Sequence, residues 1–93
     1  MGTDDILALL RAMANHRRLV LLSLLLDGER NVSALQELSG NSQACVSQHL
    51  AVMRKARVVA ARRLGHQVIY RLRPQAAGAV RALLAACAMP RPT

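Results

Sequence analysis

Aromatic side chains are almost absent from this sequence of 93 residues, which has one tyrosine, no phenylalanine and no tryptophan. A protein that binds single-stranded nucleic acid by stacking needs several aromatic faces, so that class is excluded. Leucine, valine, alanine, isoleucine and methionine must supply the core, and this composition suits helices better than a β-sandwich. With 53% hydrophobic residues, the chain is too apolar for a disordered tail.

Long apolar runs are also missing. The longest covers residues 19–26, contains Ser23, and is far shorter than the roughly 20 residues that cross a bilayer. The first residues do not have the basic and then apolar pattern of a secretory signal. Two cysteines do not make the disulfide framework of a small secreted protein. We therefore expect one cytoplasmic domain over residues 1–93, without a membrane partner.

Acidic side chains are absent from the second part of the chain. Residues 38–93 contain nine arginine or lysine residues and no acid, whereas residues 1–37 contain four arginines and five acids. A surface that only keeps a protein soluble normally mixes both signs of charge. The separation of charge therefore indicates a polyanionic partner.

Residues suited to catalysis or metal binding are not grouped. The five acids lack the context of an acid/base pair, and no nucleophile–base pair or glycine-rich phosphate loop is present. His16, His49 and His66 do not form a metal cluster by their spacing. We expect no enzymatic activity, no cofactor and no metal site.

Hydrophobic periodicity and helix-start residues predict five helices. Asn15 and Ser42 are expected N-caps, and Ser33 with Gln36 has the pattern of a capping box. The helix after Asn15 is apolar on nearly all sides, so we expect it to be the buried central helix. The predicted helices cover about residues 4–13, 15–27, 33–40, 42–56 and 75–89.

Between the fourth and fifth helices, β-branched residues flank a tip that contains Gly65, which predicts a β-hairpin over about residues 58–72. Two short helices joined by a glycine turn, over about residues 33–56, come before it. The predicted fold is mainly α with a small β-hairpin, in the order of four helices, two strands and one helix. This is the order of a winged helix-turn-helix.

The fourth predicted helix has the features of a DNA-reading helix. Val46, Leu50 and Met53 recur at helical spacing and should face the core, which leaves a polar side free. A helix fits the major groove of B-DNA, and recognition helices usually meet bases near their N-terminal ends. Together with basic residues of the hairpin, the expected DNA contacts are Ser42, Gln43, Ser47, Gln48, His49, Arg54, Arg62, Arg63 and His66.

The segment SQACVSQHLAVMR, residues 42–54, is close to the recognition-helix pattern Ser-x-x-x-Val-Ser-x-His-Leu of the ArsR/SmtB family of bacterial winged-helix repressors. Residues 14–19 and 65–72 are similar to the opening of helix two and to the wing of that family, and the resemblance covers about residues 5–87. It implies a homodimer bound to a palindromic double-stranded operator. The resemblance also implies that eight residues of the first and last helices belong to a dimer interface and not to the monomer core. They are Ile6, Leu9, Leu10, Met13, Val80, Leu83, Leu84 and Cys87.

The resemblance does not supply a signal. Asn31 and Ser33 stand where the family's thiolate metal site has cysteines, and the chain has no Asp, His or Glu after Arg73 for the site on the last helix. Cys45 and Cys87 are the only soft ligands, so a thiol- or metalloid-responsive repressor is one hypothesis. The alternatives are a repressor that has lost its sensor, of constitutive or nucleoid type, and a winged-helix module that binds an acidic protein.

Overall fold

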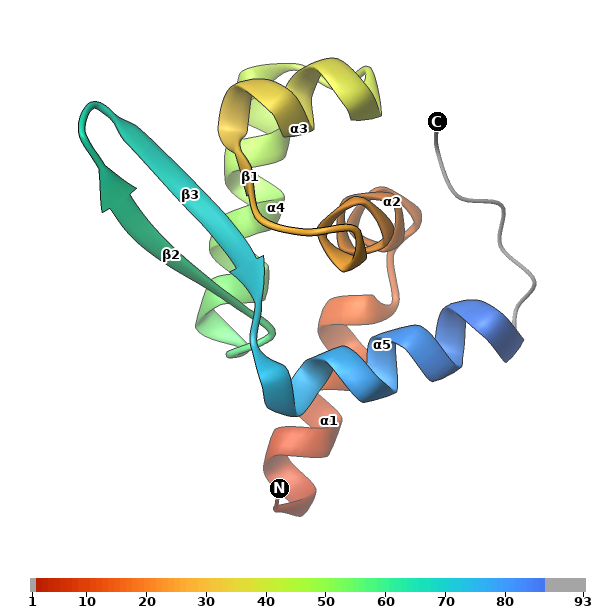
Figure 1. Ribbon diagram of the computed structural model, residues 1–93. Coiled ribbons are helices and arrows are strands. Elements are labelled where there is room, and N and C mark those ends of the chain that lie inside the picture. Colours follow the sequence, from red (N-terminus) through yellow and green to blue (C-terminus); the bar gives the residue numbers. More distant parts are fainter. Residues whose placement is uncertain (1, 87–93) are drawn as a thin grey trace.

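Five helices and three short strands make up the part of the chain, residues 2–86, that the computed structural model describes (Figure 1). Within residues 2–86, none of the helices is long and apolar enough to cross a membrane. The predicted fold class is confirmed: mainly helical with a small β-hairpin. The elements are α1 (Thr3–Met13), α2 (His16–Leu26), β1 (Arg30–Asn31), α3 (Val32–Ser39), α4 (Gln43–Lys55), β2 (Val59–Leu64), β3 (Gln67–Leu72) and α5 (Pro74–Ala86).

Two of the predicted N-caps are confirmed. The side chain of Asn15 accepts hydrogen bonds from the backbone N–H groups of Arg17 (3.0 Å) and Arg18 (3.2 Å). Ser42 Oγ accepts one from the N–H of Cys45 (3.2 Å). These bonds satisfy donors that the first turn of a helix leaves free. The Ser42 cap fixes where α4 begins and therefore which of its side chains point outward.

The third predicted cap is wrong. Asn31 takes the place expected for Ser33: its Oδ1 accepts a hydrogen bond of 2.8 Å from the N–H of Ala34, and α3 begins at Val32. An N-cap residue needs an extended backbone. Asn31 has one, with φ −82° and ψ 170°, because it also belongs to β1. The pairing of β1 with β3 therefore places the start of α3.

The predicted hairpin is confirmed, and it carries a third strand. Strands β2 and β3 are antiparallel, with Val59 opposite Leu72 and Leu64 opposite Gln67. Gly65 opens the two-residue turn with a φ of 62°, a left-handed conformation that glycine adopts at little cost. β1 adds to the free edge of β3, so the sheet order is β1-β3-β2. β1 was not predicted from the sequence.

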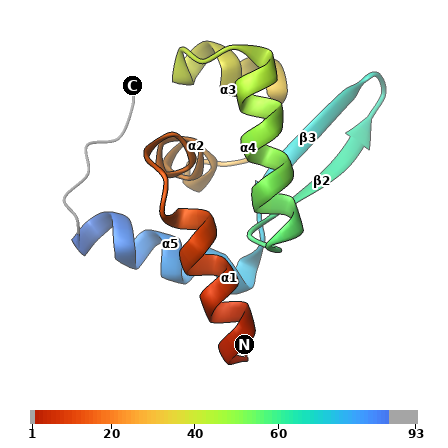
Figure 2. The same ribbon diagram turned by 180° about the vertical axis from the view of Figure 1, so that it is seen from behind.

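The predicted central helix is confirmed as α2. It lies in the middle of the molecule in Figures 1 and 2, where it contacts α1, α3, α4 and α5. Leu21, Leu22, Leu24 and Leu25 are all buried, on several sides of the helix. Burial of one such side chain contributes about 1.5–3 kcal/mol, so α2 organises the core.

Part of the predicted dimer interface lies in the core of a single chain instead. Leu9 and Met13 of α1 and Val80 and Leu84 of α5 are buried without any partner copy. The expectation that they serve an interface in place of the core is wrong, because α1 and α5 both pack against α2 and cover these residues.

The remaining apolar residues of the two terminal helices are more accessible. Ile6 and Leu10 are 45% and 52% exposed, and Leu7 beside them is 42% exposed. Leu83 is half-buried against the core. Cys87, the last residue predicted for the interface, lies outside the described residues.

The C-terminal end of α4 is closed by a Schellman motif. The N–H of Val58 donates to the carbonyl of Met53 (2.9 Å), and the N–H of Arg57 donates to that of Arg54 (3.0 Å). Val58 and Met53 are both fully buried, which supplies the hydrophobic contact typical of the motif. Arg57 occupies its left-handed position with a φ of 61°, where glycine is the usual residue.

Candidate nucleic-acid interface

Helix α4 separates its side chains into a buried and an outer face. Val46, Leu50 and Met53 have no exposed surface and pack into the core, as predicted. The outer face of α4 is defined here by five exposed polar or basic side chains. In Figure 2 this helix lies at the front, with the hairpin beside it. The outer face consists of Gln43, Ser47, Gln48, Arg54 and Lys55.

The N-terminal half of the outer face has free hydrogen-bonding groups. Within the described part of the chain, the side chains of Gln43, Ser47 and Gln48 form no hydrogen bond. Ser42, also predicted as a DNA contact, uses one lone pair of its hydroxyl oxygen as the N-cap acceptor and retains its O–H donor and a second lone pair. Two amides and a hydroxyl therefore face solvent over about one helical turn, with both donors and acceptors available.

His49 lies at the side of α4, near the start of α2. Its ring is half-buried, and its buried Nδ1 has no hydrogen-bond partner among residues 2–86. Desolvation lowers the pKa of His49 below the usual value, and the positive charges of Arg18 and Arg17 lower it further. The neutral imidazole is favoured, so His49 carries little positive charge toward a polyanion near neutral pH.

The wing, residues 58–72, places its two neighbouring arginines on opposite faces. Successive side chains of a strand point to opposite sides, so Arg63 shares one face with Val68 and Arg62 shares the other with Ile69. A surface hollow of about 220 Å³ between α4 and the wing is lined by Arg54, Ala61, Arg62, Arg63 and Val68. This hollow joins the basic end of the outer face to the wing.

Arg62 is engaged within the chain. Its Nη2 lies 2.7 Å from Glu29 Oε2, which follows the end of α2. That hydrogen bond lowers the pKa of Glu29, which the charges of Arg62 and Arg71 lower further, and it raises the pKa of Arg62. Because Glu29 partly neutralises Arg62, Arg63 is the freer of the two cations.

His66 lies at the tip of the wing, in the turn that Gly65 opens, and its side chain is exposed. Of the predicted contacts, the structure brings Gln43, Ser47, Gln48 and Arg54 to one face and Arg63 beside them. It places His66 farther along the hairpin, pairs Arg62 with Glu29, and leaves the ring of His49 half-buried at the side of α4.

Basic residues from the first part of the chain also border α4, and the charge pattern of the sequence missed them. Arg17 Nη1 lies 3.2 Å from Cys45 Sγ in the first turn of α4. Arg11 lines a hollow between α1 and α4 together with Val52 and Lys55. The charge contrast between residues 1–37 and 38–93 did not predict these basic residues beside α4, because only the fold brings the start of α2 against α4. The one signal in the sequence was the position of these arginines on the predicted helices.

The possible sensor residues are differently placed. Cys45 is a free, half-buried thiol at the N-terminal end of α4, and Cys87 lies outside the described residues. Residues 2–86 contain no group of three or more His, Cys, Asp or Glu side chains that could hold a metal. At the position of the family's thiolate site, Asn31 caps α3 and donates through Nδ2 to Gln67 Oε1 at 3.1 Å.

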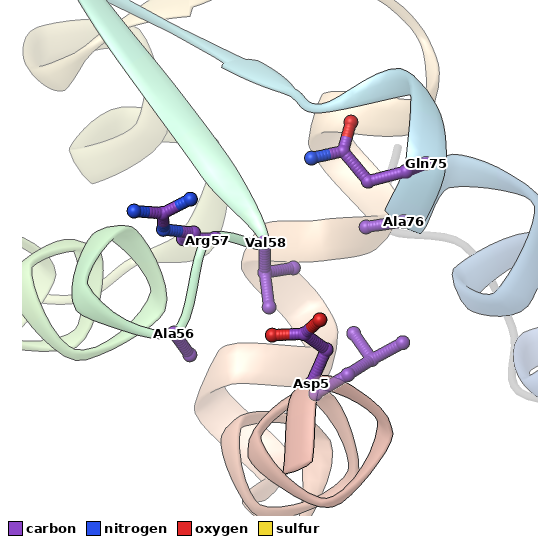
Figure 3. A pocket seen from close by; sticks show the side chains of 7 residues that line it. Asp5, Ala56, Arg57, Val58, Gln75 and Ala76 are labelled. Carbon is purple, nitrogen blue, oxygen red and sulfur yellow. The ribbon is translucent and has the colours of Figure 1, made fainter. Parts of the chain in front are cut away.

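A separate cavity of about 200 Å³ lies where α1, the end of α4 and the start of α5 meet (Figure 3). Its lining combines a carboxylate, an amide and an arginine with small apolar side chains. The lining residues are Asp5, Leu9, Ala56, Arg57, Val58, Gln75 and Ala76.

The sequence profile described as "bacterial regulatory protein, arsR family" matches residues 15–61, which include α2, α3 and α4. The chain belongs to the ArsR family.

Two curated relatives of this ArsR-family chain are transcriptional regulators. The transcriptional activator HlyU of Vibrio cholerae is 45% identical over 64 residues, which cover 69% of this chain and 59% of that protein. A biofilm growth-associated repressor of Xylella fastidiosa is 36% identical over 69 residues, which cover 74% of this chain and 60% of that protein. The matches therefore span about three fifths of each relative. These relatives are regulators of transcription, a class of protein that is not enzymatic.

Solved structures agree with the ArsR-family fold over nearly the whole chain. HlyU from Vibrio cholerae superimposes with a TM-score of 0.85 at 34% identity, covering 96% of this chain and 100% of that one. A homodimeric winged helix-turn-helix DNA-binding domain from Mycobacterium bovis gives a TM-score of 0.85 at 30% identity, covering 91% and 80%. The predicted winged helix-turn-helix is confirmed.

Proposed function

We propose that this ArsR-family protein is a homodimeric repressor that binds a palindromic operator in double-stranded DNA. The observation that carries the proposal is the outer face of α4, where Gln43, Ser47 and Gln48 lack partners within residues 2–86 and lie beside basic residues. A buried or internally bonded face could not read bases. Support also comes from the Mycobacterium bovis relative, which is a homodimeric DNA-binding domain.

In the proposed complex, α4 enters the major groove with its N-terminal half toward the bases. The amide of Gln43 or Gln48 can pair with adenine through one donor and one acceptor, which discriminates against the other bases. Arg54 and Lys55 at the other end of the helix, and Arg63 on the wing, supply contacts to phosphate. Phosphate contacts position the protein, whereas the amides supply sequence preference.

The proposed dimer uses the residues that remain accessible on the terminal helices. Ile6, Leu7 and Leu10 form an exposed apolar stripe on α1, and Leu83 lies half-buried on α5. Two identical stripes can cover each other in an isologous contact. Such a dimer presents two copies of α4 about 34–36 Å apart, or at a multiple of this distance, to match a palindrome.

Selection of bound sequences from a pool of random DNA duplexes tests this function. We expect enrichment of an inverted repeat, and Gln48→Ala should lose about 1–3 kcal/mol of binding free energy on the selected duplex but little on a scrambled one. Thr3→Ala, a change at the exposed start of α1, is the matched control and should bind normally. Enrichment without a repeated element, or equal losses on both duplexes, contradicts the proposal. Binding only to acidic proteins would favour the interaction-module alternative.

Control by thiol chemistry is a second proposal, supported by the position of Cys45. Its Sγ lies 3.2 Å from Arg17 Nη1 at the edge of the outer face, and the side chain is only half-buried. The thiolate attacks a peroxide, one oxygen is transferred to form a sulfenic acid, and water or an alcohol leaves. The added group would enlarge the edge of α4 and weaken operator binding.

Titration of operator binding with hydrogen peroxide, and separately with arsenite, tests the second proposal. Wild type should lose affinity, and Cys45→Ser should retain it, while Cys87→Ser separates the contribution of the other cysteine. If wild type and Cys45→Ser respond equally, control through Cys45 is wrong. If neither responds, the chain is a non-inducible repressor with respect to thiol chemistry.

A further inference from the structure

The cavity between α1, α4 and α5 has an apolar floor and a polar mouth. Leu9, Val58 and Ala76 form the floor and are at most 5% exposed. Asp5 and Gln75 come from different walls: in Figure 3 the carboxylate of Asp5 points toward Val58, and the amide of Gln75 extends from the start of α5 on the other side of Val58. A concave surface that combines apolar side chains with a few polar groups is the usual form of a small-molecule site.

The polar groups of the mouth are available for a ligand. Asp5 Oδ2 accepts one hydrogen bond, from the N–H of Gly2 at 3.2 Å, which leaves Oδ1 free among the described residues. The amide of Gln75 forms no hydrogen bond with any residue in the described range 2–86. A carboxylate and an amide carbonyl together offer acceptors to a group that carries several N–H donors.

Arg57 forms part of the wall of the cavity and has a φ of 61°, a conformation that costs a residue other than glycine or asparagine free energy. The Schellman motif that ends α4 accounts for this conformation. The side chain of Arg57 forms no hydrogen bond or ion pair with residues 2–86.

We propose that this cavity binds a small primary ammonium compound with a short apolar body. The ammonium group donates to Asp5 Oδ1 and to the carbonyl of Gln75, and the apolar body covers Leu9, Val58 and Ala76. A space of about 200 Å³ holds roughly seven water-sized groups, so the ligand has about five to seven non-hydrogen atoms. An analogue that carries a carboxylate would be repelled by the carboxylate of Asp5.

The position of the cavity connects such a ligand to regulation. Its walls belong to α1 and α5, the helices of the proposed dimer, and to the joint at which α4 ends and the wing begins. A ligand that bridges these elements changes DNA affinity if it binds the DNA-bound and free arrangements differently. This regulatory role rests on the proposed DNA-binding function, whereas binding in the cavity does not.

Titration of the 93-residue protein by ¹H–¹⁵N NMR tests the site. The probe is 3-methylbutylammonium, and 3-methylbutanol and 3-methylbutanoate are the neutral and negative analogues of similar shape. We expect shifts of the amides of Leu9, Val58 and Ala76, with tightest binding of the ammonium and weakest binding of the carboxylate.

Asp5→Asn keeps the shape of the side chain and removes its charge. It should weaken binding of the ammonium about tenfold, the loss expected for a charged hydrogen bond, and leave binding of the alcohol unchanged. Asp4→Asn is the matched control, because Asp4 lies one position away on α1, is exposed and does not line the cavity. Shifts located elsewhere, equal affinity for all three probes, or equal losses in the two variants overturn the proposal.

Operator affinity measured with and without the ammonium probe tests the regulatory part. A change of at least threefold that Asp5→Asn abolishes supports it. If the NMR titration detects binding but operator affinity does not change, the regulatory part is wrong. If the protein alone binds no DNA, the proposed function fails, and the NMR result still decides the cavity.

Discussion

Arg57 shows most clearly how one residue can work against stability. The Schellman motif at the end of α4 needs a left-handed residue, and arginine adopts this conformation at a cost that glycine avoids. We therefore expect Arg57→Gly to raise the free energy of unfolding by about 1 kcal/mol, measured by urea denaturation. Lys55→Gly is the control: the same change inside the helix should lower it by about 1 kcal/mol. An Arg57→Gly protein no more stable than wild type contradicts the assigned strain.

His49 predicts how stability depends on pH. Burial and the charges of Arg18 and Arg17 lower its pKa in the folded protein, so the unfolded chain binds more protons below about pH 6.5. Stability from this residue is therefore present above that pH and is lost as the pH falls toward the lowered pKa. The midpoint of urea unfolding should decrease from pH 7.5 to 5.5 in wild type and decrease less in His49→Gln. His66→Gln, on the exposed wing tip, should keep the wild-type decrease, and a profile of His49→Gln that equals wild type contradicts this prediction.

At the scale of elements, Asn31 joins the helix-turn-helix to the wing through one side chain. Its Oδ1 caps α3 and its Nδ2 donates to Gln67 Oε1 at the start of β3. The short strand β1 adds backbone pairing between the same two units. The angle between α4 and the wing therefore depends on contacts made by residues 30 and 31.

Substitution of Asn31 by alanine or by aspartate separates its role as the N-cap of α3 from its bond to Gln67. Asn31→Ala should cost about 1 kcal/mol, because it removes the cap, whereas Asn31→Asp keeps an acceptor for the N–H of Ala34 and should cost less. Both variants lose the bond to Gln67, so the NMR signals of Gln67 and its neighbours should shift in both. Gln67→Ala is the control that removes only this link. If the alanine and aspartate variants are equally stable, the N-cap is not the larger of the two contributions that Asn31 makes to the free energy of unfolding.

The elements that local sequence determines were the ones that could be predicted. Asn15 and Ser42 cap helices through bonds to residues two or three positions away, and the spacing of Val46, Leu50 and Met53 identified the buried face of α4. The outer face, the central part of the candidate site, follows from that periodicity. These predictions needed no knowledge of the rest of the fold.

Features that depend on distant parts of the chain could not be predicted. β1 pairs with residues about 40 positions later, and this pairing moved the N-cap from Ser33 to Asn31. Arg62 and Arg63 are neighbours in the sequence, and the position of Glu29 in the fold decides which of them is paired within the protein. An apolar stripe also does not reveal whether its own chain or a second copy covers it, which explains the error at Leu9 and Val80.

For the whole molecule, the accessible part of α1 predicts how the dimer forms. Leu10 is 52% exposed, so Leu10→Lys should leave the fold of a single chain intact and weaken dimerisation at least about tenfold. Analytical ultracentrifugation measures this change. Leu38→Lys on α3, which is also exposed, is the control and should remain dimeric. A Leu10→Lys protein that dimerises as wild type does excludes this face of α1 from the interface.

The central claim is that the outer face of α4 lies in the major groove of each half of an operator, and directed cleavage tests it most directly. An iron chelate is attached at Ser47→Cys, with Cys45 and Cys87 replaced by serine, and the protein is bound to a selected duplex. Our account predicts two groups of cuts related by the dyad of the site, about 10–10.5 base pairs or a multiple apart. Uniform cutting, or cuts confined to the flanks that the wings reach, would contradict it.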